Sequence, residues 1–211
     1  MRRETCSCLC DAEDSSGTAL RLEMSKTEEL AVVLSEALCN ELHFRYVIPD
    51  EPARLRFLRG YFGSAMRASQ LNGEIYTTPR VDGGALWIGP GRGLTLASMM
   101  TMSPSEALKR CINLITHLDE VHQQLVRGLH LYLLALGVKP SRQNESAEAI
   151  LLEPLLARAD SDDLLCYLET FNDKHLPLYE RHGFRIAGSG KIPGGGPDFW
   201  AMIRKPSQKI R

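Results

Sequence analysis

The segment from Val138 to Ala159, VKPSRQNESAEAILLEPLLARA, has a pattern that could bind a phosphate group. An apolar strand ends at Val138, a polar loop follows, and apolar residues then recur at helical spacing. The first turn of such a helix presents unpaired N–H groups and a partial positive charge to an anion. Phosphate-wrapping loops commonly use glycine to bring the backbone close, and this loop has none. The residues therefore leave two alternatives open: a phosphate site, or an ordinary connection between a strand and a helix.

The pattern around this segment predicts one α/β domain with a mixed sheet and helices on both faces. The near-continuous apolar run HLYLLALGV favours a central strand that is covered on both sides. Strands are expected at 19–24, 74–79, 84–90, 130–138, 164–170, 184–190 and 198–205. Helices are expected at 26–39, 52–70, 104–125, 146–159 and 173–182.

Composition points to a small-molecule partner in the cytoplasm. The formal net charge is −1 over 211 residues, and the basic residues form no stripe of the kind that binds nucleic acid. The longest apolar runs are too short to span a bilayer, and no stretch has the layout of a signal peptide. We therefore expect no nucleic-acid or membrane partner, and a monomer or homodimer.

The cysteines fall into two groups. Cys6, Cys8 and Cys10 lie in a polar segment, and their spacing does not match that of a metal site, so we expect no metal there. We interpret residues 1–17 as a flexible N-terminal arm, followed by a single domain at 18–211. Each of the other three cysteines stands alone within an apolar pattern, which favours a buried free thiol. These are Cys39, Cys111 and Cys166.

The strings LYLLALGVKPSRQ, YLETFN, LYERHGF and FWAMIRKP occur in this order between His130 and Pro206. Together they resemble the GNAT superfamily of acyl-CoA-dependent N-acetyltransferases, and within it the puromycin N-acetyltransferase type. A weaker likeness extends to RYVIPDEPARLRFL and ALWIGPG. The resemblance implies a GNAT fold with a mixed, splayed sheet of six or seven strands, in which 131–138 and 164–170 are adjacent parallel strands that diverge towards their C-terminal ends. It also implies acetyl-CoA as co-substrate and a small-molecule amine as acceptor.

The resemblance also implies the site residues. The strand end at Leu136, Gly137 and Val138 corresponds to the segment that binds the pantetheine arm, and Asn172 to an asparagine that touches the same arm. Tyr179 corresponds to the tyrosine that serves as general acid. The loop that wraps the pyrophosphate corresponds to Gln143, Asn144, Glu145, Ser146, Ala147 and Glu148.

This loop departs from the family pattern, which has glycine or another small residue where Ser146 and Glu148 stand. Serine can itself donate a hydrogen bond to phosphate. A carboxylate about 4 Å from a phosphate charge, in contrast, costs about 4 kcal/mol near a protein surface unless it turns away or pairs with Arg142. In an ordinary helix, Glu145 and Glu148 would be favourable first-turn residues.

Amine acetylation needs a neutral amine and a proton for the departing thiolate, which a tyrosine hydroxyl such as that of Tyr179 can supply. Among the histidines, His130 is the one expected near the site, either as a base or as a structural residue. Acceptor-pocket candidates are the aromatic residues Phe44, Tyr46, Tyr76 and Trp200, each of which could equally belong to the core, and no acidic cluster is apparent on those segments.

Two classes of function stay open. Gln143, Asn172 and Tyr179 favour a working N-acetyltransferase. Asn144, Ser146 and Glu148 favour a GNAT-fold protein with impaired acetyl-CoA binding, acting as a binding or regulatory module or using another acyl donor.

Overall fold

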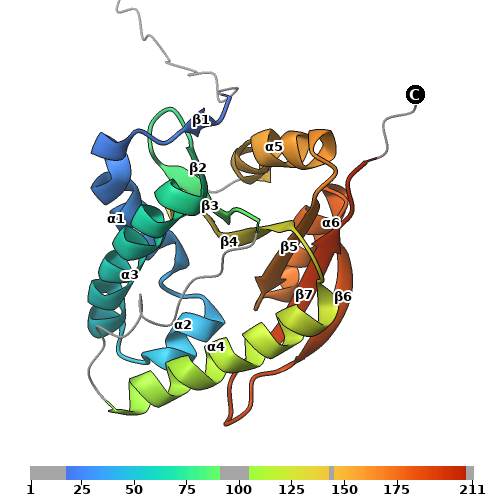
Figure 1. The fold of residues 1–211 in the computed structure, drawn as a ribbon. Coiled ribbons are helices and arrows are strands. Elements are labelled where there is room, and N and C mark those ends of the chain that lie inside the picture. Colours follow the sequence, from blue (N-terminus) through green and yellow to red (C-terminus); the bar gives the residue numbers. More distant parts are fainter. Residues whose placement is uncertain (1–17, 91–104, 143–144, 208–211) are drawn as a thin grey trace, which may run out of the picture.

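The protein is built on one mixed β-sheet whose strand order is β1-β2-β3-β4-β5-β7-β6 (Figure 1). The computed structural model describes residues 18–90, 105–142 and 145–207, and the statements below concern these residues. The strands are β1 Leu20–Arg21, β2 Gly73–Thr77, β3 Gly83–Ile88, β4 His130–Val138, β5 Leu165–Thr170, β6 Arg185–Lys191 and β7 Asp198–Arg204. Within the described sheet, β4 and β5 pair in parallel and the other neighbours are antiparallel.

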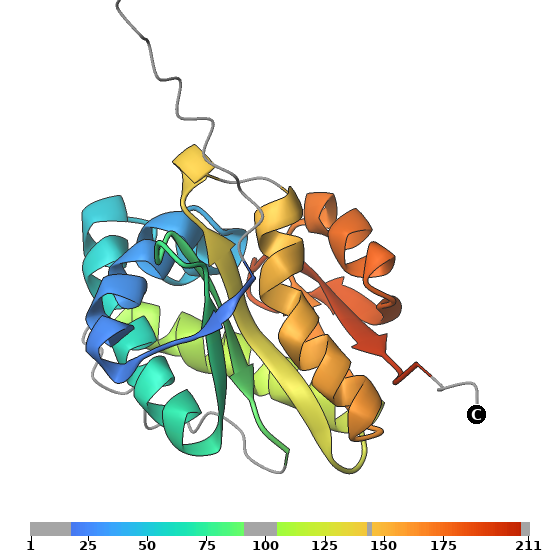
Figure 2. The ribbon, with the colours of Figure 1, turned by 90° about the horizontal axis from the view of Figure 1, so that it is seen from above.

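The helices cover both faces of the sheet (Figures 1 and 2). They are α1 Thr27–Leu38, α2 Leu42–Val47, α3 Glu51–Asn72, α4 Ser105–Leu125, α5 Glu145–Ser161 and α6 Leu176–Arg181. Short 3-10 turns lie at Met24–Lys26, Pro140–Arg142 and Asp173–His175. Helix α3 starts where the sequence favours it, since Asp50 accepts a hydrogen bond of 2.9 Å from the Ala53 N–H and Pro52 occupies the first turn.

One face of the sheet packs against α5 and α6. Its core contains Trp87 from β3, Leu131 and Leu133 from β4, and Cys166 and Leu168 from β5, which alternate along their strands as sheet geometry requires. Figure 2 shows α5 lying along β4. This layer fixes the N-terminal end of α5 beside the C-terminal end of β4.

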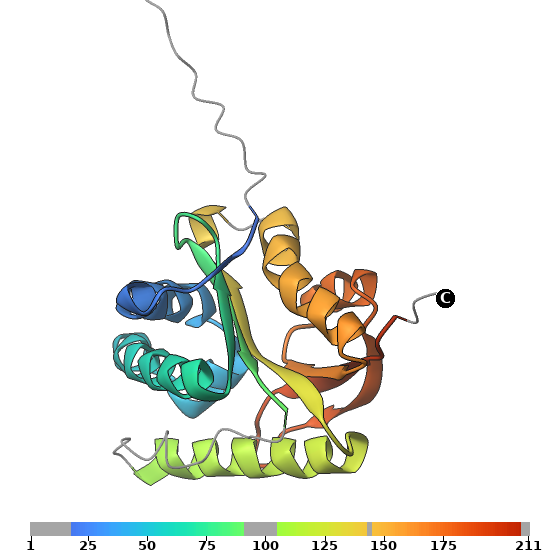
Figure 3. The same cartoon turned by 45° about the horizontal axis from the view of Figure 1, so that its top comes forward.

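The opposite face is divided between two helical groups. Helices α1 and α3 lie side by side and cover the β2–β4 half, with Leu34, Phe62 and Leu86 in their core. Helix α4 runs beneath the sheet and covers the β5–β7 half, with Tyr167 and Phe199 in its core (Figure 3). Because the two groups are separate, space is left between them under β4 and β5.

Most expected elements are confirmed, and the residues 130–138 form a strand over the range that was expected. The main correction is α2, which lies at Leu42–Val47 where no helix was expected. The first strand is also shorter than expected, because the chain turns into a 3-10 helix at Met24. Cys39, Cys111 and Cys166 are buried free thiols, as expected.

The interpretation of residues 1–17 as an arm, and the question of a metal at Cys6, Cys8 and Cys10, lie outside the described residues. Within the described residues, no group of His, Cys, Asp or Glu side chains has the arrangement of a metal site. No helix there combines the length and the apolar character that crossing a membrane requires.

Candidate active site

The two central strands separate part of the way along the sheet. The last parallel pair joins Leu133 of β4 to Leu168 of β5, so the expected divergence is confirmed. Beyond this pair β4 stays on β3 as far as Val138, while β5 continues along β7. The β5-facing edge at Leu136, Gly137 and Val138 therefore carries no neighbouring strand in the described structure.

Gly137 also has a packing role. A methyl group added at its Cα would lie 3.2 Å from side-chain atoms of Leu34 and Leu38 and 3.3 Å from Ala37. Glycine thus lets α1 approach the end of β4 closely. The residue type at this position is explained by helix packing, whether or not a ligand lies along the strand edge.

The expected pyrophosphate loop lies at the start of α5. Residues 143–144 fall outside the described part of the chain, and α5 begins at Glu145. Ser146 is exposed, while Ala147 is half-buried and packs against the core beneath α5. Glu148 is half-buried, so its side chain is not directed simply into solvent.

Tyr179, on α6, combines a packing role with access to a cavity. Only 7% of the residue is exposed, and its ring contacts that of Phe184 at a centroid distance of 5.9 Å. Burial, followed by the negative charges of Glu148 and Glu41, raises the pKa of its hydroxyl. The hydroxyl therefore keeps its proton at neutral pH. Glu41, Glu148 and Tyr179 come from three separate elements and act on one another electrostatically.

Asn172 caps the turn before α6. Its side-chain oxygen accepts a hydrogen bond of 3.2 Å from the Lys174 N–H, and its Nδ2 lies 3.5 Å from Nε2 of His175. Asn172 does not line the cavity described next, but His175 does. The capping role accounts for the asparagine without a ligand.

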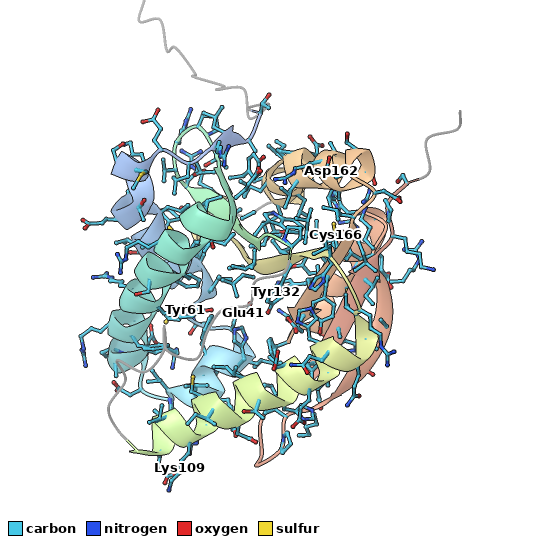
Figure 4. All side chains as sticks on the ribbon, viewed as in Figure 1. Glu41, Tyr61, Lys109, Tyr132, Asp162 and Cys166 are labelled. Carbon is cyan, nitrogen blue, oxygen red and sulfur yellow. The ribbon has the colours of Figure 1, made fainter. Side chains whose placement is uncertain are left out.

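A cavity of about 410 Å³ lies under the separated strands, between the α1–α3 group and α4. Its aromatic and aliphatic walls include Tyr61 and Phe62 from α3, Leu114 from α4 and Phe171 after β5. Figure 4 shows Glu41, Tyr61 and Tyr132 around this central space. The titratable groups that line it are Glu41, Asp119, Glu169, His43, His122, His130, His175, Tyr61, Tyr132 and Tyr179.

Glu169 is the most strongly perturbed acid in this cavity. Burial raises the pKa of its carboxyl from 4.5 to about 7, although the hydroxyls of Tyr132 and Tyr167 favour the ionised form, and the charge of Asp119 raises it slightly further. Tyr167 is itself fully buried beside this carboxyl. A carboxyl with a pKa near 7 can accept or release a proton at physiological pH.

Two histidines meet at one end of the cavity. Nε2 of His122, in the last turn of α4, lies 2.8 Å from Nε2 of His130, at the start of β4. At the other end, His43 stacks on Phe171 with a centroid distance of 4.2 Å. Burial lowers the pKa of His43 to about 3, and its Nδ1 has no hydrogen-bond partner within the described residues.

The structure does not bring the four aromatic candidates for the acceptor pocket together at this cavity. Phe44 lines the cavity, but Tyr46, Tyr76 and Trp200 do not. Tyr46 instead lies against the β6–β7 hairpin, with its hydroxyl 3.3 Å from the Pro193 carbonyl oxygen, and the Tyr76 hydroxyl donates to Glu74. The expectation that His130 would be the histidine near the site was also too narrow, since three further histidines line the cavity.

The carboxyl groups of the cavity were not singled out in the sequence. Glu41, Asp119 and Glu169 lie far apart along the chain and converge on one cavity. A partial signal existed in YLET, where period-two alternation puts Tyr167 and Glu169 on the same face of β5. That alternation could not show that this face would border a cavity.

Comparison with solved structures shows that this chain shares its fold with proteins named as acetyltransferases. The structure of histone acetyltransferase HPA2 and related acetyltransferase from Corynebacterium glutamicum aligns with a TM-score of 0.68 at 22% identity, covering 92% of this chain and 99% of that one. The polyamine N-acetyltransferase of Drosophila melanogaster, which forms N-acetylagmatine, aligns at 0.63 and 14% identity, covering 89% and 98%. Arylalkylamine N-acetyltransferase 2 from Aedes aegypti aligns at 0.64 and 9% identity, covering 90% and 98%.

No protein-family model matches the chain. The similarity is therefore one of fold, and the chain has the GNAT acyl-CoA N-acyltransferase fold. A particular likeness to the puromycin N-acetyltransferase type is not shown.

Proposed function

We propose that this protein is an N-acetyltransferase that moves an acetyl group from acetyl-CoA to the amine of a small molecule. The observation that carries the proposal is the divergence of β4 and β5 directly over a cavity lined by Glu169 and Tyr179. An acyl donor lying along the free edge of β4 would bring its thioester to the same cavity that receives the amine. Solved structures with this fold include enzymes named for acetyl transfer to agmatine, polyamines and arylalkylamines.

The residues partly fit acetyl-CoA. The edge at Leu136–Val138 offers backbone groups to a pantetheine arm, and the first turn of α5 offers N–H groups to a pyrophosphate. Glu148 opposes this fit, because this half-buried residue lies in the first turn of α5 and its negative charge already acts on Tyr179. Binding of the donor is therefore expected to be weaker than a glycine-containing loop would allow.

Tyr179 is the candidate general acid. Its raised pKa keeps the hydroxyl protonated, so it can donate to the thiolate of CoA as the thioester bond breaks. Its position on the cavity wall is compatible with this role. The pKa of Glu41, another residue of the cavity wall, is raised mainly by burial. The charge of His175 lowers this pKa and the charge of Glu148 raises it.

The cavity suits a small amine with an apolar body. Its volume of about 410 Å³ falls in the range of small-molecule sites, and aromatic walls alternate with a few polar groups. Three carboxylates make the interior attractive to a cation. The acceptor is thus proposed to be a compact amine that enters as its ammonium form.

The second candidate is a GNAT-fold binding or regulatory module, or an enzyme that uses another acyl donor. It is favoured by one observation, the carboxylate of Glu148 at the position where a pyrophosphate would meet α5. A donor without a pyrophosphate would not meet this charge.

Calorimetric titration with acetyl-CoA and with CoA distinguishes the two candidates. Micromolar binding of acetyl-CoA, together with release of free CoA thiol when a panel of small amines is added, would support the enzyme. No binding at millimolar acetyl-CoA would refute the acetyltransferase and favour the second candidate. Tyr179→Phe is the matched variant, because it should keep the binding and lose most of the turnover.

A further inference from the structure

The cavity under the separated strands has two chemically different ends. Its carboxyl groups Asp119 and Glu169 belong to the end near His122, since the charge of Asp119 acts on both of the other side chains. The other end is aromatic, and its wall consists of His43, Phe44, Tyr61, Phe62 and Phe171. A ligand that spans the cavity therefore needs a cationic group at one end and an apolar group at the other.

The aromatic wall is held in place by contacts among its own rings. The Phe44 ring meets those of Tyr61 and Phe62 edge-on, at centroid distances of 6.0 and 6.1 Å. Tyr61 and Phe62 lie next to each other on α3, are buried, and have their ring centroids 5.0 Å apart. Rings fixed in this way offer a surface that another aromatic ring can contact at low entropic cost.

His43 brings an uncharged hydrogen-bonding group to this wall. Its ring stacks on Phe171 at a centroid distance of 4.2 Å and meets Phe44 at 4.0 Å. Burial lowers its pKa to about 3, so the imidazole is neutral at physiological pH. A neutral imidazole has one N–H donor and one bare nitrogen that accepts.

The surroundings of the His43 ring indicate which nitrogen can meet a ligand. Nδ1 is buried and has no hydrogen-bond partner within the described residues. Buried N–H groups without a partner are rarer in proteins than acceptors in the same state, which puts the proton on Nε2. Because Phe171 covers one ring face and the Nδ1 edge is enclosed, the Nε2 edge is the one left to border the cavity. His43 thus offers the cavity an N–H donor.

Strand β5 sets the spacing between this donor and the acidic end. Glu169 lies in β5, and Phe171 follows two residues later. Residues two apart along an extended chain are separated by roughly 7 Å, and the His43 ring is stacked beside the second of them. A group bound at His43 therefore lies roughly 7–10 Å from a group bound at Glu169. An amine nitrogen and the far side of a ring joined to it by a short alkyl chain have this separation.

We propose that the acceptor is an alkylamine with an aromatic ring that carries an oxygen substituent, and that His43 is the residue that selects it. The ammonium group lies beside Asp119 and Glu169, and the ring lies against Phe44 and Tyr61. The oxygen accepts a hydrogen bond from Nε2 of His43. This inference rests on the proposed acetyltransferase function and names the substrate class of that function.

The same arrangement disfavours two other classes of amine. A diamine would bring its second ammonium to apolar rings and to an N–H donor, where it finds no negative charge. Glu41 precedes His43 by two residues, but its carboxyl interacts with His175 and Glu148. An amino acid would bring a carboxylate into a cavity that three carboxyl groups already line, and neutral His43 cannot compensate its charge.

Two amines that differ by a single hydroxyl test this proposal. Tyramine carries a hydroxyl on its ring, and phenethylamine is the same molecule without it. Calorimetric titration of the purified protein, with and without CoA, should show tyramine binding about 3- to 10-fold more tightly, as one net hydrogen bond allows. Putrescine, a diamine without a ring, should bind more weakly than either.

Three variants assign the preference to His43. His43→Phe keeps an aromatic ring on Phe171 without its nitrogens and should bring the ratio of the two affinities to about 1. His43→Gln keeps an N–H donor and should restore part of the preference. His117→Phe is the control, because His117 contacts Phe199 at 5.6 Å and does not line the cavity, so the wild-type ratio should persist. A packing role of His43 alone would weaken both aromatic amines equally and leave their ratio unchanged.

The outcomes separate this inference from the function on which it rests. Equal binding of tyramine and phenethylamine, an unchanged ratio in His43→Phe, tighter binding of putrescine, or no binding of the aromatic amines would overturn the inference. A tyramine preference that depends on His43, without release of CoA thiol from acetyl-CoA, would support the recognition by His43 and refute the acetyltransferase.

Discussion

Replacing Glu169 by glutamine should stabilise the folded protein at alkaline pH and change its stability little at acid pH. Burial beside the cavity walls raises the pKa of this carboxyl from 4.5 to about 7. In the unfolded chain the same group faces water and ionises at its ordinary pKa. Folding above neutral pH therefore places a charge in a poor environment, and glutamine, with nearly the same shape, removes that charge.

The sign and the size follow from the two pKa values. Below about pH 4.5 the carboxyl is protonated in both states, and its full contribution to stability is present. That contribution is lost as the pH rises through the folded pKa near 7, because the unfolded state releases the proton more readily. The pKa difference of about 2.5, which is 7 minus 4.5, corresponds to about 3 kcal/mol. Glu169→Gln should gain roughly this amount at pH 8, equivalent to about 10 °C in Tm.

The assay is urea unfolding of the wild type and of Glu169→Gln at pH 5, 6, 7 and 8. Glu153→Gln is the matched control, since Glu153 is exposed on α5 and its replacement should give a small difference at every pH. A free-energy gap between wild type and Glu169→Gln that is as large at pH 5 as at pH 8 would refute the reasoning. Such a result would mean that the carboxyl is no harder to ionise in the folded state than in water.

Three further measurements test the site and the frame that holds it. Tyr179→Phe should leave acetyl-CoA affinity nearly intact by calorimetry and lower turnover by roughly 10²-fold or more, and unchanged turnover would exclude proton donation by this hydroxyl. Glu148→Gly should tighten CoA binding more than Ser146→Gly, with a gap that narrows in high salt, whereas equal affinities at low salt would show that the Glu148 charge does not reach the phosphates. Arg54→Met should lower the free energy of unfolding by about 3 kcal/mol or more, because the buried guanidinium donates to the carbonyl oxygens of Cys39, Ile48 and Pro49 at 2.6–2.8 Å. A loss below about 1 kcal/mol, measured by urea unfolding, would contradict that role.

Local patterns in the sequence predicted most of the fold because each depends on near neighbours. The strand at His130–Val138 was found at its full length, since an unbroken apolar run ends where Lys139 begins a polar stretch. The helix at Leu42–Val47 was missed because six residues are too few for a clear helical period. Its place depends on Arg54 of α3, which binds the Ile48 carbonyl just beyond the end of α2. That contact joins separate elements and leaves no pattern within the segment.

The resemblance to known acetyltransferases led to Tyr179 and to the β4 edge, and the structure brings both to the borders of one splayed region. Whether Gln143, Asn144, Ser146 and Glu148 hold a pyrophosphate stays a prediction. The binding role of Asn172 also stays a prediction, beside the capping role that the structure shows.

The sequence by itself determined the order of the strands and of every helix except α2, the buried thiols, and the face of β5 on which Glu169 lies. Only the tertiary structure decided that this face borders a cavity, because the cavity arises where β4 leaves β5 and where α4 stays apart from α3. The pairing of His122 with His130 was decided in the same way, by the turn that brings the end of α4 against the start of β4. Ionisation and proton transfer depend on burial and on distances of a few ångströms between side chains, and residue order alone specifies neither.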